Sequence, residues 1–202
     1  MSPSSPSDVI DTLAGIAPGS ALDRARDNRT EARKHAQASY DSLFALKDFG
    51  TFTAQERFAV AAFVAALHGK TETKEYYAAK LASTGASPEL RVAIASEVVD
   101  AHTHGPYGHY PKGPLSLEDK EGMTYTVAPT PRGILGQRLA AAFEHTHMLV
   151  FHPRDAAPPS LQKLLDSGWS ITDIVTLSQL VSFLAFQIRV VAGLKAMNSR
   201  PA

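Results

Sequence analysis

The sequence predicts an all-α protein: a helical bundle interrupted by one long irregular loop, over about residues 102–133. Apolar residues recur at three- and four-residue steps through most of the chain, as on the buried face of a helix. No stretch shows the strict alternation of apolar and polar residues that is typical of a strand. The 202 residues suffice for a sizeable core. We therefore expect a flexible N-terminal segment, 1–19, followed by one helical domain, 20–202.

Helix start signals place the elements in the first half of the chain. Ser20 is a good N-cap residue. Thr53 and Glu56 form a capping-box pattern directly before an apolar run. Ser87 and Pro88 supply a cap and a proline at the first helical position. We therefore expect helices over residues 9–16, 20–46, 53–68, 71–83 and 87–101.

The second half begins with the loop, in which glycine, proline and aromatic residues predominate. Loops of this length inside a domain are uncommon and are often functional. Two interpretations stay open: a lid or partner-binding arm, and an irregular segment that covers a subunit interface. Helices are expected again over residues 134–150, 160–165 and 170–197.

The last of these helices is apolar nearly all round between Ile174 and Leu194. Such a helix must be covered on most sides, and a second subunit is the natural cover. Ser, Gln and Arg residues interrupt the apolar run, so we expect no membrane span. The prediction is a homo-oligomer.

Charge and cysteine content limit the possible functions. Twenty basic residues balance twenty acidic ones, so the chain has no overall positive charge that would favour nucleic acid as a partner. The first residues are polar and lack the basic-then-apolar order of a secretion signal. Because the chain also contains no cysteine, we expect a soluble cytoplasmic protein without thiol chemistry, disulfides or Cys-bound metal.

Several segments resemble one family. The segments Leu164–Ile174 and Phe183–Leu194 resemble the C-terminal helices of the carboxymuconolactone decarboxylase and alkylhydroperoxidase D-like (AhpD-like) superfamily, and are closest to its peroxidase-related branch. The stretch from Phe52 to Gly69 resembles the helix that leads to that branch's reactive motif. The loop resembles that of an elongated subgroup known only as CMD domain proteins. The resemblance covers most of residues 40–100 and 134–197.

The resemblance implies an AhpD-like helical domain and a dimer- or trimer-based oligomer, but it argues against peroxidase activity. The family's Cys-x-x-Cys-x-x-x-His motif falls on Lys70, Thr73 and Tyr77. Its relay glutamate falls on Phe58, two residues from Glu56. A cysteine pair is needed to reduce a peroxide and then close as a disulfide. All four motif positions are replaced in this chain.

The decarboxylase side of the superfamily needs no cysteine and works on a small lactone acid by acid–base chemistry. A histidine and a glutamate in a helix-lined cleft can serve that chemistry. For each of these residues a structural role remains the alternative, such as a helix cap for Glu56 or a helix end for His68. The residues with suitable side chains are Glu56, His68, Glu144, His145 and His147, together with Tyr77 at the motif position.

Arg189 is the only charged residue in the apolar middle of the last helix. A buried ion pair is the expected role, because an unpaired charge there is costly. The alternative is that Arg189 binds the carboxylate of a substrate.

No metal site and no cofactor are expected, although the loop histidines are candidate metal ligands. His102, His104 and His109 lie near one another on the loop but match no strong metal motif. The Glu-x-x-His pattern at Glu144 and His147 occurs once, whereas di-iron bundles need it twice.

Two functions therefore compete. The first is cysteine-independent acid–base chemistry on a small organic acid or lactone. The second is a non-catalytic oligomeric partner of a related, cysteine-bearing AhpD-like protein.

Overall fold

The all-α prediction is confirmed by the computed structural model, which describes residues 8–199. Within that range the ordered elements are helices, and the only β-type pairing is an isolated bridge between Gly108 and Lys120. The elements are α1 (Val9–Ala14), α2 (Ala21–Asp27), α3 (Thr30–Phe44), α4 (Ala54–Leu67), α5 (Thr71–Ser83), α6 (Pro88–Asp100), η1 (Pro114–Glu118), α7 (Pro129–Phe151), η2 (Pro153–Asp155), α8 (Pro158–Asp166) and α9 (Ile171–Asn198).

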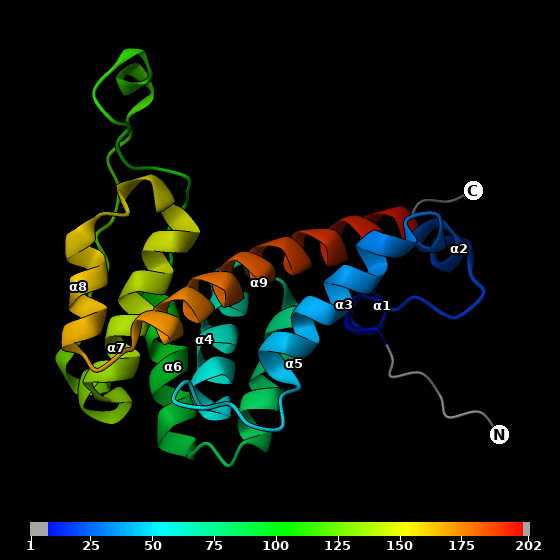
Figure 1. Cartoon of the computed structure of the whole chain (residues 1–202), viewed down its shortest axis with the longest axis horizontal. Helices are drawn as coiled ribbons and strands as arrows, with labels where there is room; N and C mark the ends of the chain where they lie inside the picture. The colour runs from blue at the N-terminus through cyan, green and yellow to red at the C-terminus, as the bar shows by residue number, and fades with distance from the viewer. Residues whose placement is uncertain (1–7, 200–202) are drawn as a thin grey trace.

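Helix α4 forms the centre of the bundle. It packs against α3, α5, α6, α7 and α9. Helix α9 is the longest helix and runs across the bundle (Figure 1). Alanines at positions 59, 61, 62 and 65 are buried and let neighbouring helices approach closely. Phe63 of α4 stacks on Phe143 of α7, with ring centroids 4.3 Å apart. These contacts fix the position of α7, which carries much of the candidate site.

Most predicted helix starts agree with the structure. Thr53 and Glu56 form the expected reciprocal capping box, and Ser87 caps α6. The expected helix over 20–46 differs, because it is divided into α2 and α3 by a break at Asn28 and Arg29. Helix also resumes earlier than expected after the loop, at Pro129, with a kink at Gly136.

The expectation of a flexible segment over residues 1–19 needs correction from residue 8 onward; residues 1–7 lie outside the described range. Asp8 caps α1, and the side chains of Val9, Ile10 and Leu13 are buried. Helix α1 packs on α9, α3 and α5. The hydrophobic contacts of these apolar side chains make α1 part of the folded domain.

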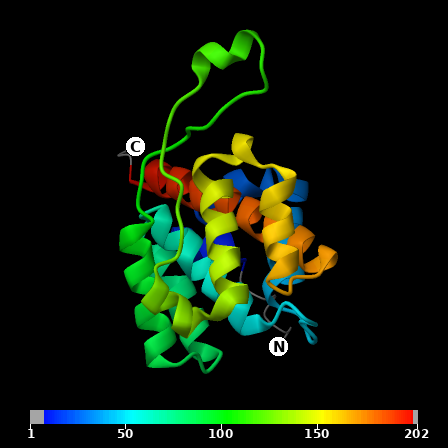
Figure 2. The same cartoon turned by 90° about the vertical axis from the view of Figure 1, so that its left-hand side faces the viewer.

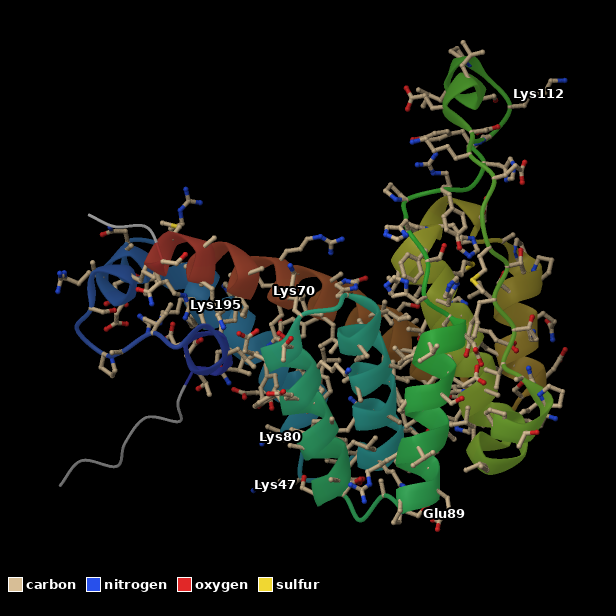
Figure 3. The ribbon with its side chains drawn as sticks, turned by 180° about the vertical axis from the view of Figure 1, so that it is seen from behind. Lys47, Lys70, Lys80, Glu89, Lys112 and Lys195 are labelled. Carbon is tan, nitrogen blue, oxygen red and sulfur yellow. The ribbon has the colours of Figure 1, made fainter. Side chains whose placement is uncertain are left out.

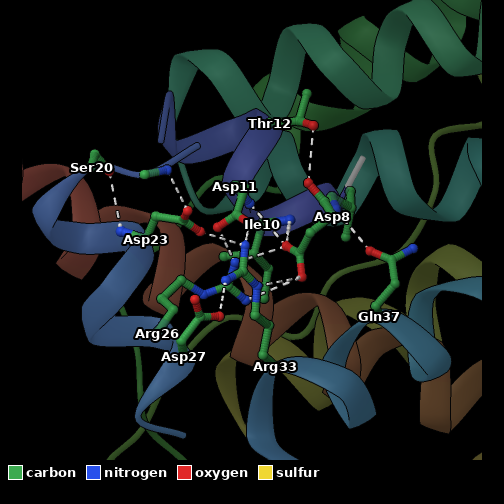
Figure 4. Close-up of polar contacts among 12 residues, drawn as sticks. Asp8, Ile10, Asp11, Thr12, Ser20, Asp23, Arg26, Asp27, Arg33 and Gln37 are labelled. Carbon is green, nitrogen blue, oxygen red and sulfur yellow. Dashed lines mark hydrogen bonds and ion pairs between the residues drawn. The ribbon is translucent and has the colours of Figure 1, made fainter. Parts of the chain in front are cut away.

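A cluster of ion pairs holds α1 against α2 and α3 (Figure 4). Arg26 Nη1 lies 2.9 Å from Asp8 Oδ1, and Arg33 Nη2 lies 2.8 Å from Asp23 Oδ1. Both arginines also contact Asp11. The two guanidinium groups thus balance the negative charge of the carboxylates of α1 with its N-cap and of α2. Each arginine connects elements that are separate in sequence.

We expect Arg33→Gln to lower the free energy of unfolding by about 1–2 kcal/mol, because it leaves clustered carboxylates facing one another with less positive charge. Urea unfolding at low and high salt measures the effect, and the deficit should shrink in salt, which screens the remaining repulsion. The control is Lys34→Gln, at an exposed neighbour. A loss that is equal for both variants would contradict this role.

Helix α9 is only half covered by its own chain. By length and composition it is the one helix of residues 8–199 that is long and apolar enough to cross a membrane, with a mean hydropathy of 1.7 and half of its apolar window buried inside the fold. That burial is compatible with a soluble protein. The face that its own chain leaves uncovered carries Ile171, Val175, Phe186 and Met197, and the sequence prediction assigns such a face to a second subunit.

The long loop forms an arm, defined here as residues 102–128, that projects beyond the ends of α7 and α8 (Figures 1 and 2). Its root is anchored, since Tyr107, Tyr125 and Val127 are buried. Its far end carries η1 and Lys112, well away from the helices (Figure 3). Leu117, in η1, is 95% exposed. The arm therefore has a packed root and a free tip.

Candidate functional site

A cleft of about 400 Å³ lies between the root of the arm and helices α7 and α8. The arm supplies one wall, and α7, η2 and α8 supply the other. Apolar side chains and titratable groups share its surface, as is common for small-molecule sites. The lining includes Tyr107, His109, Tyr125, Glu144, His145, Met148, His152, Asp155 and Lys163.

Glu144 places a buried carboxylate in the cleft wall. One oxygen, Oε1, accepts a hydrogen bond of 3.0 Å from the backbone N–H of Val127 and another from the guanidinium of Arg132. The other, Oε2, lies 2.5 Å from the ammonium of Lys163. A buried carboxylate is stable only with such partners. Glu144 therefore holds the arm, the start of α7 and α8 together, and it draws Lys163 to the edge of the cleft.

His145 is the neighbouring group on α7 and is also buried. Within residues 8–199 its Nδ1 has no hydrogen-bonding partner. Burial lowers the pKa of His145, because the charged imidazolium loses hydration. At neutral pH the ring is thus neutral; the residue lines the cleft, and its Nδ1 is itself buried.

His152 and Asp155 form a pair at the end of the cleft. His152 Nδ1 lies 2.9 Å from Asp155 Oδ2, and the backbone N–H of His109 donates to Asp155 Oδ1 at 2.7 Å. Burial opposes ionisation of Asp155, but these hydrogen bonds outweigh it and hold the pKa of Asp155 below its usual value. The ring of His152 stacks on Tyr107 at 4.8 Å. The pair joins an oriented imidazole to an ionised carboxylate.

His147 lies beneath the cleft and is fully buried. Its Nε2 donates to the carbonyl oxygen of Ala101 at 3.1 Å, and the rings of Tyr125, Phe151 and His152 surround it. Burial lowers its pKa to about 4. These contacts give His147 a structural role under the root of the arm.

The other candidates from the sequence lie elsewhere in the bundle. Glu56 caps α4 and forms an ion pair with Arg138, with Nε 2.7 Å from Oε1. The hydroxyl of Tyr77 donates to Gln187 Oε1 at 2.6 Å inside the core. His68 is half-buried at the end of α4, and burial together with the charge of Arg189 lowers its pKa to about 4.

Arg189 corrects the expectation of a buried ion pair. Its side chain is exposed and donates to the carbonyl oxygen of Ala185 at 2.7 Å, one turn back on α9. No carboxylate of the described range forms an ion pair with it. A side chain as long as arginine reaches solvent from the helix surface, so the apolar sequence around it did not imply burial.

The three loop histidines do not converge. His102 and His104 are exposed, with ring centroids 5.6 Å apart, whereas His109 turns toward Glu121, with Nε2 and Oε1 at 2.9 Å. In the part of the chain that the structure covers, no group of three or more His, Asp or Glu residues is arranged to hold a metal ion.

The fold and the cleft together define an all-α protein with a cleft that the arm bounds on one side and that contains histidines and carboxylates. Comparison of the chain with protein-family models, with curated proteins and with solved structures gave no match in any of the three.

Proposed function

We propose that this protein carries out cysteine-independent acid–base chemistry on a small organic acid or lactone, in the manner of carboxymuconolactone decarboxylases. The observation that carries the proposal is the cleft of about 400 Å³, whose lining contains the imidazole of His145 and the hydrogen-bonded pair of His152 and Asp155. Proton transfer by a positioned imidazole needs this kind of surrounding.

The roles follow from charge and partners. Lys163 is more than half exposed beyond its contact with Glu144, so its ammonium offers a positive charge to a substrate carboxylate. His145 stays neutral because of its burial and adds no charge to the cleft wall. His152 has the ionised Asp155 at its Nδ1, which orients the ring for proton transfer. Met148 and Tyr107 supply apolar surface for the body of a small ring.

A decarboxylation can use these groups directly. The C–C bond to the carboxylate breaks, carbon dioxide leaves, and the electron pair moves into the conjugated lactone carbonyl. A proton from the imidazolium of His152 then adds to the carbon that lost the carboxylate. The next substrate cycle begins when the ring recovers a proton from water.

A panel of carboxylated butenolides and open-chain oxo acids tests this function, with ultraviolet absorbance and carbon dioxide release as readouts. We expect turnover of at least one lactone acid and a loss of about 100-fold or more in kcat for His152→Gln, the usual size of a general acid–base contribution. His104→Gln, at an exposed position outside the cleft, is the matched control. Absence of binding and turnover across the panel at millimolar concentrations would contradict the proposal.

We also propose that the protein is a cytoplasmic homo-oligomer that associates through the open face of α9 and α8. An apolar groove lies between α3, α8 and α9, and its lining contains no charged side chain. A face without charge can meet its own copy across a two-fold axis without like-charge repulsion. The apolar groove residues are Leu43, Leu161, Leu165, Ile171, Ile174, Val175 and Phe183.

Sedimentation velocity tests the association. We expect the unchanged protein to sediment as an oligomer and Val175→Glu to shift it toward monomer, because the variant places a charge in the contact. Val92→Glu, at a similarly exposed valine on α6, should leave the mass unchanged. A monomeric unchanged protein that associates with a cysteine-bearing relative would favour the alternative function, a non-catalytic partner.

A further inference from the structure

The carboxylate of Asp155 connects two parts of the cleft that come from distant segments. Its Oδ1 accepts the backbone N–H of His109, on the arm, at 2.7 Å. Its Oδ2 faces Nδ1 of His152, at the end of α7, at 2.9 Å. Both oxygens of one side chain are thus engaged, one by the wall that the arm forms and one by the imidazole of the cleft.

The root of the arm is shaped to receive this carboxylate. Gly108 has a φ of +107°, and a Cβ built there would lie 2.5 Å from Asp155 Oδ2. Only glycine combines that backbone conformation with so close an approach. The same residue exchanges two backbone hydrogen bonds with Lys120, of 2.8 and 3.2 Å, which close the root of the arm. The carboxylate of Asp155 therefore occupies the space that a side chain at position 108 would need.

The arm also touches the imidazole itself. The Tyr107 ring stacks on His152 with an interplanar angle of 16°, and its hydroxyl donates to the carbonyl oxygen of Met123 at 2.6 Å. The backbone N–H of Tyr107 donates to the carbonyl oxygen of Phe151 at 3.0 Å. The orientation of His152 is thus defined by one ring on its face and one carboxylate at its Nδ1.

We propose that Asp155 is the positioning residue of the cleft, which fixes His152 in the tautomer with the proton on Nδ1 and fastens the arm beside it with the same carboxylate. The inference rests on the function proposed above, in which His152 transfers the proton. An ionised carboxylate accepts only, so the proton between it and Nδ1 belongs to the ring. Nε2 is then the ring nitrogen through which His152 exchanges a proton with the substrate.

The substitution Asp155→Asn makes the inference testable, because the carboxamide has a single acceptor oxygen. It cannot accept from both His109 and His152 in the observed geometry. At least one of the two contacts must be lost, although the side chain keeps its shape. Gly108→Ala provides a second, independent route, since its methyl group displaces the carboxylate.

Two measurements on the whole protein, at a pH at which its imidazole rings are neutral, follow the two contacts. ¹⁵N-detected imidazole spectra report the tautomer of His152, with His152→Gln used to assign its signals. Hydrogen exchange reports the protection of the His109 amide. We expect the Nδ1–H tautomer in the unchanged protein. Asp155→Asn should lose that tautomer, or exchange the His109 amide about tenfold faster or more, as expected for a lost bond to a charged group. Gly108→Ala should behave likewise.

Asp119→Asn is the matched control, because Asp119 also accepts one backbone N–H, from Tyr110, but lies in the arm away from His152. It should keep the Nδ1–H tautomer of His152 and the slow exchange of the His109 amide. An Nε2–H tautomer in the unchanged protein, or both signals retained in Asp155→Asn, would overturn the assignment. These spectra need no substrate, so they separate this inference from the turnover assay. In that assay, Asp155→Asn should lower kcat about tenfold or more with little change in KM, as expected when a group orients the proton donor.

Discussion

Replacing Arg57 by methionine should lower the free energy of unfolding by about 3 kcal/mol, the cost expected when buried acceptors lose a charged donor. Arg57 is only 6% exposed and forms no ion pair with a carboxylate of residues 8–199. Its guanidinium donates instead to the carbonyl oxygens of Phe52, Leu43 and Phe49, at 2.9, 3.0 and 3.4 Å. Burial lowers the pKa of Arg57, yet a guanidinium stays charged at ordinary pH.

The physical reason for the loss is that three carbonyl groups depend on one side chain. Leu43 lies in the last turn of α3, and Phe49 and Phe52 lie in the connection between α3 and α4, which makes few backbone hydrogen bonds of its own. Methionine keeps much of the volume and the contact with the rings of Phe49 and Phe52, but it donates no hydrogen bond. The carbonyls would then be left buried without a donor, or the connection would open to water.

Urea unfolding measures this effect, with Arg91→Met as the control at an exposed arginine. The control should stay within about 0.5 kcal/mol of the unchanged protein. Arg57→Lys should fall between the two, since an ammonium keeps the charge but cannot span three acceptors in one plane. If Arg57→Met unfolded within about 1 kcal/mol of the unchanged protein, the carbonyl contacts would contribute little to stability.

Local signals explain which parts of the fold were predictable. Thr53 and Glu56 cap α4 through groups three residues apart, so a short sequence pattern contains the whole interaction. The break between α2 and α3 has no such local signal. Arg26 and Arg33 turn toward the aspartates of α1, and no periodicity within residues 20–46 indicates that partner.

The candidate site was only partly predictable, for the same reason. Glu144 and His145 were among the sequence candidates, because they carry suitable groups on an apolar helix. His152, Asp155 and Lys163 were missed, since the cleft forms only when the arm folds back on α7 and α8. His109 and Asp155, for example, lie 46 positions apart. The available sequence signal was a histidine followed three residues later by a carboxylate, beside a proline.

Acidification should destabilise the protein through His147 even before its carboxylates are protonated. Burial lowers the pKa of this histidine from 6.5 to about 4, and the hydrogen bond that its Nε2 donates to Ala101 offsets only part of that shift. Between those pH values the unfolded chain binds a proton that the folded chain excludes. The contribution of His147 is therefore complete above about pH 6.5 and is lost as the pH falls toward about 4, with a size of about 2 kcal/mol after allowance for partial screening.

Urea midpoints at steps from pH 7.5 to 4.5 measure this loss. His147→Gln should be less stable at pH 7.5, because the packed ring is gone, but its stability should fall less steeply toward pH 4.5. His68 also has its pKa lowered to about 4, first by burial and then by Arg189, so His68→Gln should flatten the same window independently. His35→Gln, at an exposed histidine, should reproduce the slope of the unchanged protein. An equally steep fall in His147→Gln would mean that another group carries the acid sensitivity, because removing a titrating group must remove its share of the proton uptake.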